Sequence, residues 1–350
     1  MQGQERAKDG PYRRRGKHSM PSLGFRKPSF TQESVVFALS AILFVIFSLT
    51  LHNFLTSGNL IALVRSVSIL GILGLGMGLV VIGRGIDLAM VAIMVVAVSW
   101  VLSLATHQHV PLGWALLIGA AFSALAGLIS GALIAYAVVP AIFTTLAMGL
   151  VIYGVGRAWL FEVDVQNTPN ESAFFQFFGN AKLFGLPLPI VIFAVFALVL
   201  WALLRWTRFG RYIYASGDNP AAARNAGVPL RPLIVSQYVI TAMVAYAAGL
   251  VMAATSAGMS TRVYNSTMIY DVLLVVVLGG IGLSGGRGGV RNVLVGTFLI
   301  GVLLDGMTIL NIPYVEQNLI KSVILLIAIV IDSFVNPRDE QTAQQEQGDI

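Results

Sequence analysis

Residues 110–156 read VPLGWALLIGAAFSALAGLISGALIAYAVVPAIFTTLAMGLVIYGVG and contain no charged residue. A helix needs about 20 apolar residues to cross roughly 30 Å of hydrocarbon, because each residue advances it by about 1.5 Å. The stretch is therefore long enough for two crossings. Pro140 lacks a backbone N–H and disfavours continuous helix. We predict two membrane-spanning helices here, with the break near Pro140.

The composition of the whole chain agrees with that of this stretch. Of its 350 residues, 57% are hydrophobic and 11% are charged, and the mean hydropathy is +0.82. Soluble domains carry about 25% charged residues. So few charges cannot cover a surface that faces water, so we expect lipid around most of the chain and a single membrane domain. The absence of cysteine excludes disulfides, thiolate metal sites and thiol catalysis.

The apolar runs predict an all-α, polytopic transmembrane helix bundle of about ten spans. Eight or nine spans remain open, because the eighth and tenth runs are short. The predicted spans cover residues 34–51, 60–82, 88–106, two helices within 110–156, 187–204, 232–254, 267–283, 292–310 and 317–331.

An even number of spans places both termini on one side of the membrane. Most of the 22 Lys and Arg residues fall in the N-terminal tail and in alternate loops, so these segments and both termini are expected to be cytoplasmic. This distribution explains the net charge of +6 without a nucleic-acid partner. The predicted parts are a basic tail (1–33), a transmembrane domain (34–333) and a C-terminal tail (334–350). The basic tail either contacts anionic lipid head groups or serves only as a topology signal.

The sequence contains no catalytic, metal or cofactor constellation. The four histidines, His18, His52, His107 and His109, offer at most a pair of neighbouring ligands in a loop. The phosphate-binding motif G-x-x-x-x-G-K-[ST] is absent, because the single Gly-Lys pair, at residues 16–17, has the wrong spacing and is followed by His18. The chain is therefore predicted to be no enzyme, and an ATPase would be a separate polypeptide.

Small residues recur four positions apart in two of the spans. Gly74 and Gly78 form one such pair, and Gly127 and Gly131 form another. Such spacing lets the backbones of two membrane helices approach closely. We therefore expect close helix contacts at these four glycines.

Three carboxylates lie in or beside the spans. Asp271 and Asp305 fall inside apolar runs, where a central Asp costs about 2.5–3.5 kcal/mol even on insertion scales. They are predicted either to line a pathway or to make polar contacts between helices. Asp87 lies three residues after Arg84 in a turn, where the two are expected to pair.

The loop at residues 205–231 reads RWTRFGRYIYASGDNPAAARNAGVPLR. Asn219 suits a helix N-cap, Pro220 suits the first helical position, and Gly227 suits a left-handed exit. A helix of about two turns is therefore encoded here. Helices this short are marginal in water and need a surface to pack on. It is either an interfacial helix or a docking helix for a cytoplasmic partner.

Four segments together resemble the membrane subunits of ABC sugar importers of the ribose, xylose, arabinose and galactose class. The resemblance covers about residues 35–333. In the first segment, Gly85, Ile86, Asp87 and Leu88 match the family's Gly-Gly-Ile-Asp-Leu signature, whereas Arg84 replaces a glycine. The four segments read VVIGRGIDLAMVAI (80–93), VPAIFTTLAMGLVIYGVGR (139–157), YIYASGDNPAAARNAGV (212–228) and VVLGGIGLSGGRGGV (276–290).

This resemblance implies a site and a set of partners. In ABC importers the docking loop reads Glu-Ala-Ala-x-x-x-Gly; Ala222, Ala223 and Gly227 fit this spacing, and Ala221 stands in place of the glutamate. The expected docking residues are Asn219, Pro220, Ala221, Ala222, Ala223, Arg224, Asn225, Ala226 and Gly227. The predicted pathway residues are Asp87, Phe143, Thr144, Thr145, Asp271 and Asp305.

The implied partners are two ATPase subunits or one duplicated ATPase, a periplasmic sugar-binding protein, a second permease subunit and membrane lipid. The expected location is the bacterial inner membrane and the expected cargo a pentose or hexose. Three alternatives remain: an importer of branched amino acids or another small solute, a proton- or ion-coupled carrier, and a non-transporting scaffold or receptor. The sequence disfavours the ion-coupled carrier because no His or Lys is predicted at the depth of Asp271 and Asp305.

Overall fold

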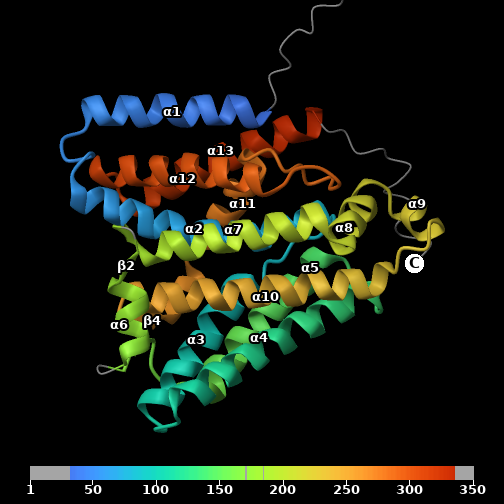
Figure 1. Cartoon of the computed structure of the whole chain (residues 1–350), viewed down its shortest axis with the longest axis horizontal. Coiled ribbons are helices and arrows are strands. Elements are labelled where there is room, and N and C mark those ends of the chain that lie inside the picture. The colour runs from blue at the N-terminus through green and yellow to red at the C-terminus, as the bar shows by residue number, and fades with distance from the viewer. Residues whose placement is uncertain (1–31, 170–171, 184, 336–350) are drawn as a thin grey trace, which may run out of the picture. The chain divides into compact units, whose positions relative to one another are not determined.

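The computed structural model describes residues 32–169, 172–183 and 185–335. Nearly all of the two tails predicted at 1–33 and 334–350 lies outside these residues. The described part is an all-α bundle of a polytopic membrane protein, as predicted (Figure 1). Each predicted span corresponds to one apolar helix, and these helices are α1 (Gln32–Thr50), α2 (Ser57–Ile82), α3 (Met90–Thr106), α4 (Leu112–Ala135), α5 (Ala141–Val155), α7 (Leu188–Trp206), α10 (Leu230–Thr255), α11 (Met268–Leu278), α12 (Val290–Ile309) and α13 (Tyr314–Val335).

Seven helices in the described part of the chain are long and apolar enough to cross a membrane. Helices α3 and α11 are apolar but shorter. Helix α11 ends at Leu278 rather than at the predicted residue 283, because Gly279 and Gly280 follow and Gly280 adopts φ +93°, outside the helical region. Its 11 residues extend only about 16 Å, roughly half of the hydrocarbon thickness. The number of ten spans therefore stays a prediction.

The break predicted near Pro140 is present. Helix α4 ends at Ala135, and α5 begins at Ala141, directly after Pro140. Helix α5 continues into a π-helical turn, Gly156–Leu160.

The connections contain elements that hydropathy did not predict. Two short helices, α6 (Ala173–Asn180) and α8 (Arg208–Asp218), accompany the predicted two-turn helix, α9 (Pro220–Asn225). Strand β1 (Val165–Asn167) pairs antiparallel with β4 (Gly258–Ser260), and β2 (Lys182–Leu183) pairs with β3 (Leu186–Pro187). Helix α6 and the strands lie at the opposite end of the bundle from α9 (Figure 1).

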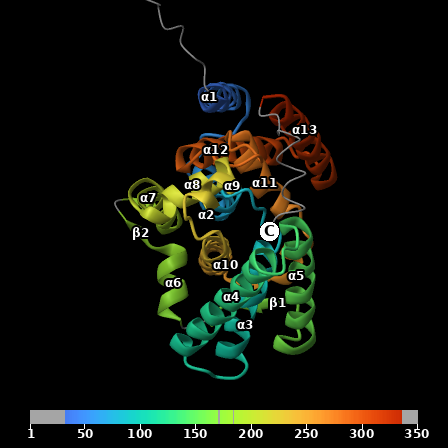
Figure 2. The same cartoon turned by 90° about the vertical axis from the view of Figure 1, so that its right-hand side faces the viewer.

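Helices α2 and α10 occupy the middle of the bundle. Figure 2 looks along the helices from the end that carries α9, and the other apolar helices surround this pair. Helix α2 packs against α7, α10, α11 and α12, and α10 packs against α2, α3 and α4. Every residue of α2 from Ser68 to Ile82 is buried, which is the pattern of a helix with protein on all sides.

Glycines set the closest helix contacts, as their spacing predicted. A Cβ atom added to Gly127 of α4 would lie 2.6 Å from the carbonyl oxygen of Tyr238 in α10, and one added to Gly131 would lie 2.7 Å from Cα of Val235. On α2, a Cβ at Gly74 would lie 2.9 Å from a methyl group of Val275. At Gly127 and Gly131 the obstacle is backbone, so a larger residue would have to push α10 away.

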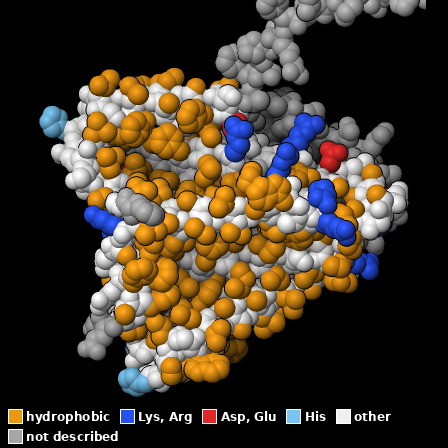
Figure 3. Space-filling view, viewed as in Figure 1, with side chains coloured by type: hydrophobic (Ala, Val, Ile, Leu, Met, Phe, Trp, Pro, Cys, Tyr) orange, Lys and Arg blue, Asp and Glu red, His pale blue; other side chains and the backbone are white. Residues whose placement is uncertain are grey.

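The surface has an apolar belt and one basic end. In Figure 3 hydrophobic side chains cover the flanks of the helices, and most of the visible Lys and Arg side chains gather at the end that carries α8 and α9. This distribution agrees with a cytoplasmic location of that end.

We predict that Gly127→Ala lowers the thermal stability of the purified protein in detergent. The added methyl group overlaps the backbone of α10, and overpacking of this kind costs about 1–3 kcal/mol. The matched control is Gly154→Ala in α5, where an added Cβ meets nothing within 4 Å. Equal melting temperatures for the two variants would contradict the α4–α10 contact described above.

Candidate functional site

Helix α9 has the caps that the sequence predicted. The Oδ1 atom of Asn219 accepts a hydrogen bond from the N–H of Ala222 at 2.9 Å, and Pro220 occupies the first helical position. At the other end Gly227 adopts φ +81°, and the N–H of Val228 donates to the carbonyl oxygen of Ala223 at 3.0 Å. The short helix is therefore closed at both ends by its own sequence.

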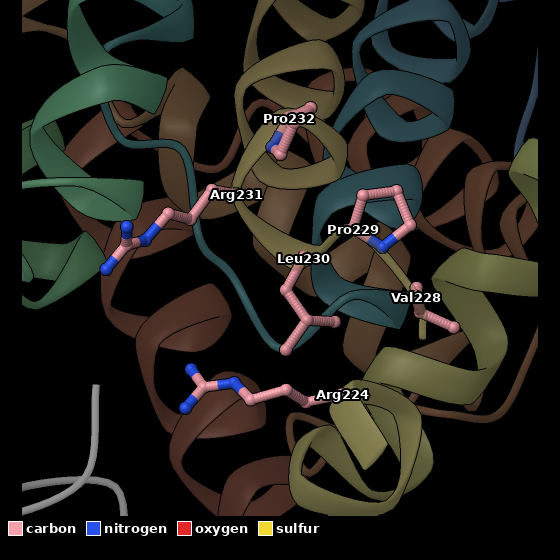
Figure 4. A pocket seen from close by; sticks show the side chains of 6 residues that line it. All are labelled: Arg224, Val228, Pro229, Leu230, Arg231 and Pro232. Atoms are coloured by element: carbon pink, nitrogen blue, oxygen red, sulfur yellow. The ribbon is translucent and has the colours of Figure 1, made fainter. Parts of the chain in front are cut away.

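Almost all of α9 is exposed. Ala223 is 4% exposed and anchors the helix, whereas the other side chains that follow Pro220 in the predicted docking segment are exposed. A hollow of about 350 Å³ lies directly beside the helix (Figure 4), and it is lined by Arg224, Val228, Pro229, Leu230, Arg231 and Pro232. In Figure 4 the guanidinium groups of Arg224 and Arg231 extend to the same side of this hollow.

The end that carries α9 therefore offers a small-residue helix next to a hollow with an apolar floor and a basic edge. Arg231 also lies over the ring of Tyr136 at the end of α4, with its Cζ atom 5.5 Å from the ring centroid. Cation–π contact of this type fixes the start of α10 against α4. The arrangement suits a protein partner with a complementary groove.

Helix α8, which precedes α9, packs on the end of α2 and on the glycine-rich turn between α11 and α12 (residues 279–289). The N–H of Gly286 donates to the carbonyl oxygen of Ile82 at 2.8 Å, and the hydroxyl of Tyr214 in α8 donates to the carbonyl oxygen of Gly288 at 2.9 Å. A Cβ on Gly217 would lie 2.5 Å from the amide nitrogen of Gly286. The glycine-rich turn thus packs directly on both α2 and α8.

The expected pairing of Arg84 with Asp87 is wrong. The guanidinium of Arg84 instead donates to two carbonyl oxygens at the end of α8, from Nε to Gly217 at 2.6 Å and from Nη2 to Asp218 at 2.8 Å. Asp87 is 1% exposed, and its Oδ1 accepts from the N–H of Ala89 at 3.0 Å. The turn directs the two side chains apart, because Arg84 adopts a positive φ of +67°.

Residues 83–89 connect α2 to α3 without helical structure and lead back into the bundle (Figure 1). Side chains of two other helices satisfy the backbone here. The carbonyl oxygen of Ile86 accepts from the hydroxyl of Tyr238 in α10 at 3.4 Å, and it lies 3.3 Å from Oγ1 of Thr145 in α5, whose shorter hydrogen bond, of 2.8 Å, goes to the carbonyl oxygen of Ala141. Among the predicted pathway residues, Thr145 therefore lies beside the connector that carries Asp87.

The remaining predicted pathway residues lie elsewhere. Phe143 is 67% exposed on the outer surface of α5, whereas Thr144 is buried and donates to the carbonyl oxygen of Val139 at 3.4 Å. Asp305 in α12 accepts from Nδ2 of Asn59 in α2 at 2.7 Å. This is a polar contact between two helices, one of the two roles predicted for Asp305. Its role in a pathway stays a prediction.

Asp271 has a partner that the sequence analysis missed. Nζ of Lys321 in α13 lies 2.8 Å from Oδ1 of Asp271 in α11, and the two side chains are 6% and 13% exposed. Nζ also donates to Oγ1 of Thr267 at 2.9 Å. The statement that no lysine matches the depth of Asp271 is therefore wrong. The signal was present, because Lys321 is a lone cation inside an apolar run.

We predict that Lys321→Met lowers stability by about 3–5 kcal/mol, because it leaves the carboxylate of Asp271 buried without its counter-charge. The double variant Lys321→Met, Asp271→Leu removes both charges and is expected to regain most of the loss. Thermal unfolding in detergent measures both. Arg291→Met is the control, since Arg291 pairs with Glu33 while 81% exposed, and exposed pairs contribute at most about 1 kcal/mol. Equal losses in Lys321→Met and Arg291→Met would contradict a buried ion pair.

Comparison with known proteins places the chain in a family. Residues 59–331 match the family model described as "Branched-chain amino acid transport system / permease component". The ribose import permease protein RbsC of Escherichia coli (strain K12) is 30% identical over 314 residues, which cover 88% of this chain and 96% of that protein.

Two further relatives have a similar length of match. The L-arabinose ABC transporter permease protein AraH of Azospirillum brasilense is 33% identical over 299 residues, which cover 84% of this chain and 85% of AraH. The galactofuranose transporter permease protein YtfT of Escherichia coli (strain K12) is 30% identical over 279 residues, which cover 79% of this chain and 80% of YtfT. No solved structure matches the chain. The chain therefore belongs to this family of permease components and is a multi-pass inner-membrane subunit of an ABC importer.

Proposed function

We propose that this permease subunit forms part of the pathway for a monosaccharide, a pentose or a hexose. The relatives described above are permeases for ribose, L-arabinose and galactofuranose, and the match extends over most of each protein. Two permease subunits, identical or different, enclose the pathway. A periplasmic binding protein delivers the sugar to the end that carries α6 and the strands.

The observation that carries the proposal is α9 itself. It is a capped, exposed helix beside a basic-edged hollow, at the end where Lys and Arg gather. ATP hydrolysis belongs to a separate chain, and two ATPase subunits, or one duplicated ATPase, hold residues 219–227, which comprise α9 and the residues that cap it. The permease itself catalyses no reaction and only transmits the movement of the ATPase to its membrane helices.

Transport follows from a change in the relative stability of two states. ATP binding favours one arrangement of the helices and hydrolysis favours the other, by as much as the ATPase binds them with different affinity. Within the pathway the hydroxyl groups of the sugar lose water, and polar groups must replace it. Thr145, which lies beside Ile86, and Asp87, the residue that follows Ile86, are closer to each other along the connector than either is to Asp305, and we assign this role to them.

A second candidate is import of branched-chain amino acids, because the matching family model is described by that activity. The buried pair of Asp271 and Lys321 supplies the cation whose expected absence disfavoured an ion-coupled carrier, but the family match supports an ABC importer instead.

We expect proteoliposomes that contain the complete complex, with its ATPase and binding protein, to accumulate radiolabelled pentose or hexose when ATP is enclosed. A panel of ribose, arabinose, galactose and leucine measures the choice of solute. Uptake of leucine alone would favour the amino-acid importer. Uptake that continues without ATP and stops when the proton gradient collapses would favour the ion-coupled carrier.

Replacing Gly227 with Val is predicted to reduce sugar-stimulated ATPase activity and uptake while leaving membrane insertion unchanged. A β-branched residue is strained at φ +81°, so the exit of α9 shifts. Gly185→Val is the control, because Gly185 has φ +80°, also has no atom within 4 Å of an added Cβ, and lies between β2 and β3 at the other end. The docking assignment fails if both variants transport equally well.

A further inference from the structure

Arg84 occupies an unusual position for its residue type. It adopts φ +67°, a left-handed conformation that favours glycine. A non-glycine residue held in this conformation is strained, and the surrounding structure must compensate for the strain. The compensation visible here is the pair of hydrogen bonds to Gly217 and Asp218.

These two acceptors lie at the base of the docking helix. Gly217 and Asp218 are the last two residues of α8, and Asn219, which follows, caps α9. Asn219 therefore connects α9 directly to the residues that Arg84 holds. The contact joins segments 133 residues apart in the sequence, and the acceptors are backbone atoms, so it does not depend on the side chains of α8.

The other side of the Arg84 turn leads into the bundle. Two residues later, the carbonyl oxygen of Ile86 accepts a hydrogen bond from Tyr238 of α10 and lies 3.3 Å from Oγ1 of Thr145 of α5. The next residue, Asp87, accepts from the N–H of Ala89 at the start of α3. One short connector is thus hydrogen-bonded to the end of α8 at Arg84, contacts α5 and α10 at Ile86, and continues directly into α3.

We propose that Arg84 is a positioning residue that transmits movement of α9 to α3, α5 and α10. This inference rests on the proposed function, because it assumes that an ATPase moves α9. The guanidinium makes two charge-assisted bonds to successive carbonyl oxygens, which resist rotation of the connector relative to α8 better than a single bond would. The turn then moves with α9, and Ile86 carries the displacement to Thr145.

The test uses Arg84→Gly, which removes the guanidinium and suits φ +67°, so the variant is expected to fold. The full complex with its ATPase and binding protein is reconstituted, and the amount of ribose, arabinose or galactose taken up is divided by the ATP hydrolysed. We expect this ratio to fall about fivefold or more, a size typical of coupling between sites. Arg287→Gly is the control, because it removes an equal charge from an exposed position in the nearby glycine-rich turn.

A second readout separates coupling from assembly and needs no sugar. The chain has no cysteine, so spin labels can be placed at chosen cysteines. One pair of spin labels is placed at the exposed positions Phe37 and Ala222, and a second pair is placed at Phe37 and Phe143. In the otherwise unaltered complex, trapping with ATP and vanadate is expected to shift both distances. In Arg84→Gly only the distance to Ala222, in α9, is expected to shift.

The outcomes divide clearly. If Arg84→Gly shifts both distances and keeps the uptake ratio of the control, Arg84 does not transmit the movement and the inference is overturned. If neither distance shifts in the unaltered complex, the proposed ATPase-driven function fails first. A shift at Ala222 without one at Phe143 in the unaltered complex would also refute transmission to α5.

Discussion

Every backbone polar group inside a lipid bilayer must find its partner within the protein, and the structure depends on this constraint. The apolar runs meet it by forming helices. Residues 83–89 are the informative exception, because they leave helical structure and still lead into the bundle. The hydroxyl of Tyr238 donates to the carbonyl oxygen of Ile86, and Oγ1 of Thr145 lies 3.3 Å from the same oxygen. Irregular backbone at this depth is tolerated because other helices surround it.

The two short helices α11 and α9 are stabilised in different ways. Helix α11 is buried over much of its length and is held by packing and by the Asp271–Lys321 pair. Helix α9 lies at the exposed end, where packing contributes little beyond Ala223. Its stability comes from the side chain of Asn219 and the left-handed Gly227. A helix maintained in this way at an exposed surface is consistent with a surface kept ready for a partner.

The features that could be predicted from the sequence are those that depend on neighbouring residues. The apolar runs located the ten helices, Pro140 located a break, and Asn219 and Gly227 defined α9. Contacts between distant segments could not be obtained in this way. Arg84 was expected to pair with its near neighbour Asp87 but reaches α8 instead, and Lys321 was missed because its partner lies 50 residues away. Helix α8 and the strands were missed because hydropathy does not mark them.

The central claim is that α9 is the surface on which the ATPase acts. Photo-crosslinking from Ala222, whose side chain is exposed on α9, tests it most directly when the complete complex is illuminated in membranes. The account predicts a crosslink from residue 222 to the ATPase polypeptide and none from Gly185 at the opposite end. Crosslinks from residue 222 to lipid alone, with the ATPase attached elsewhere, would contradict it.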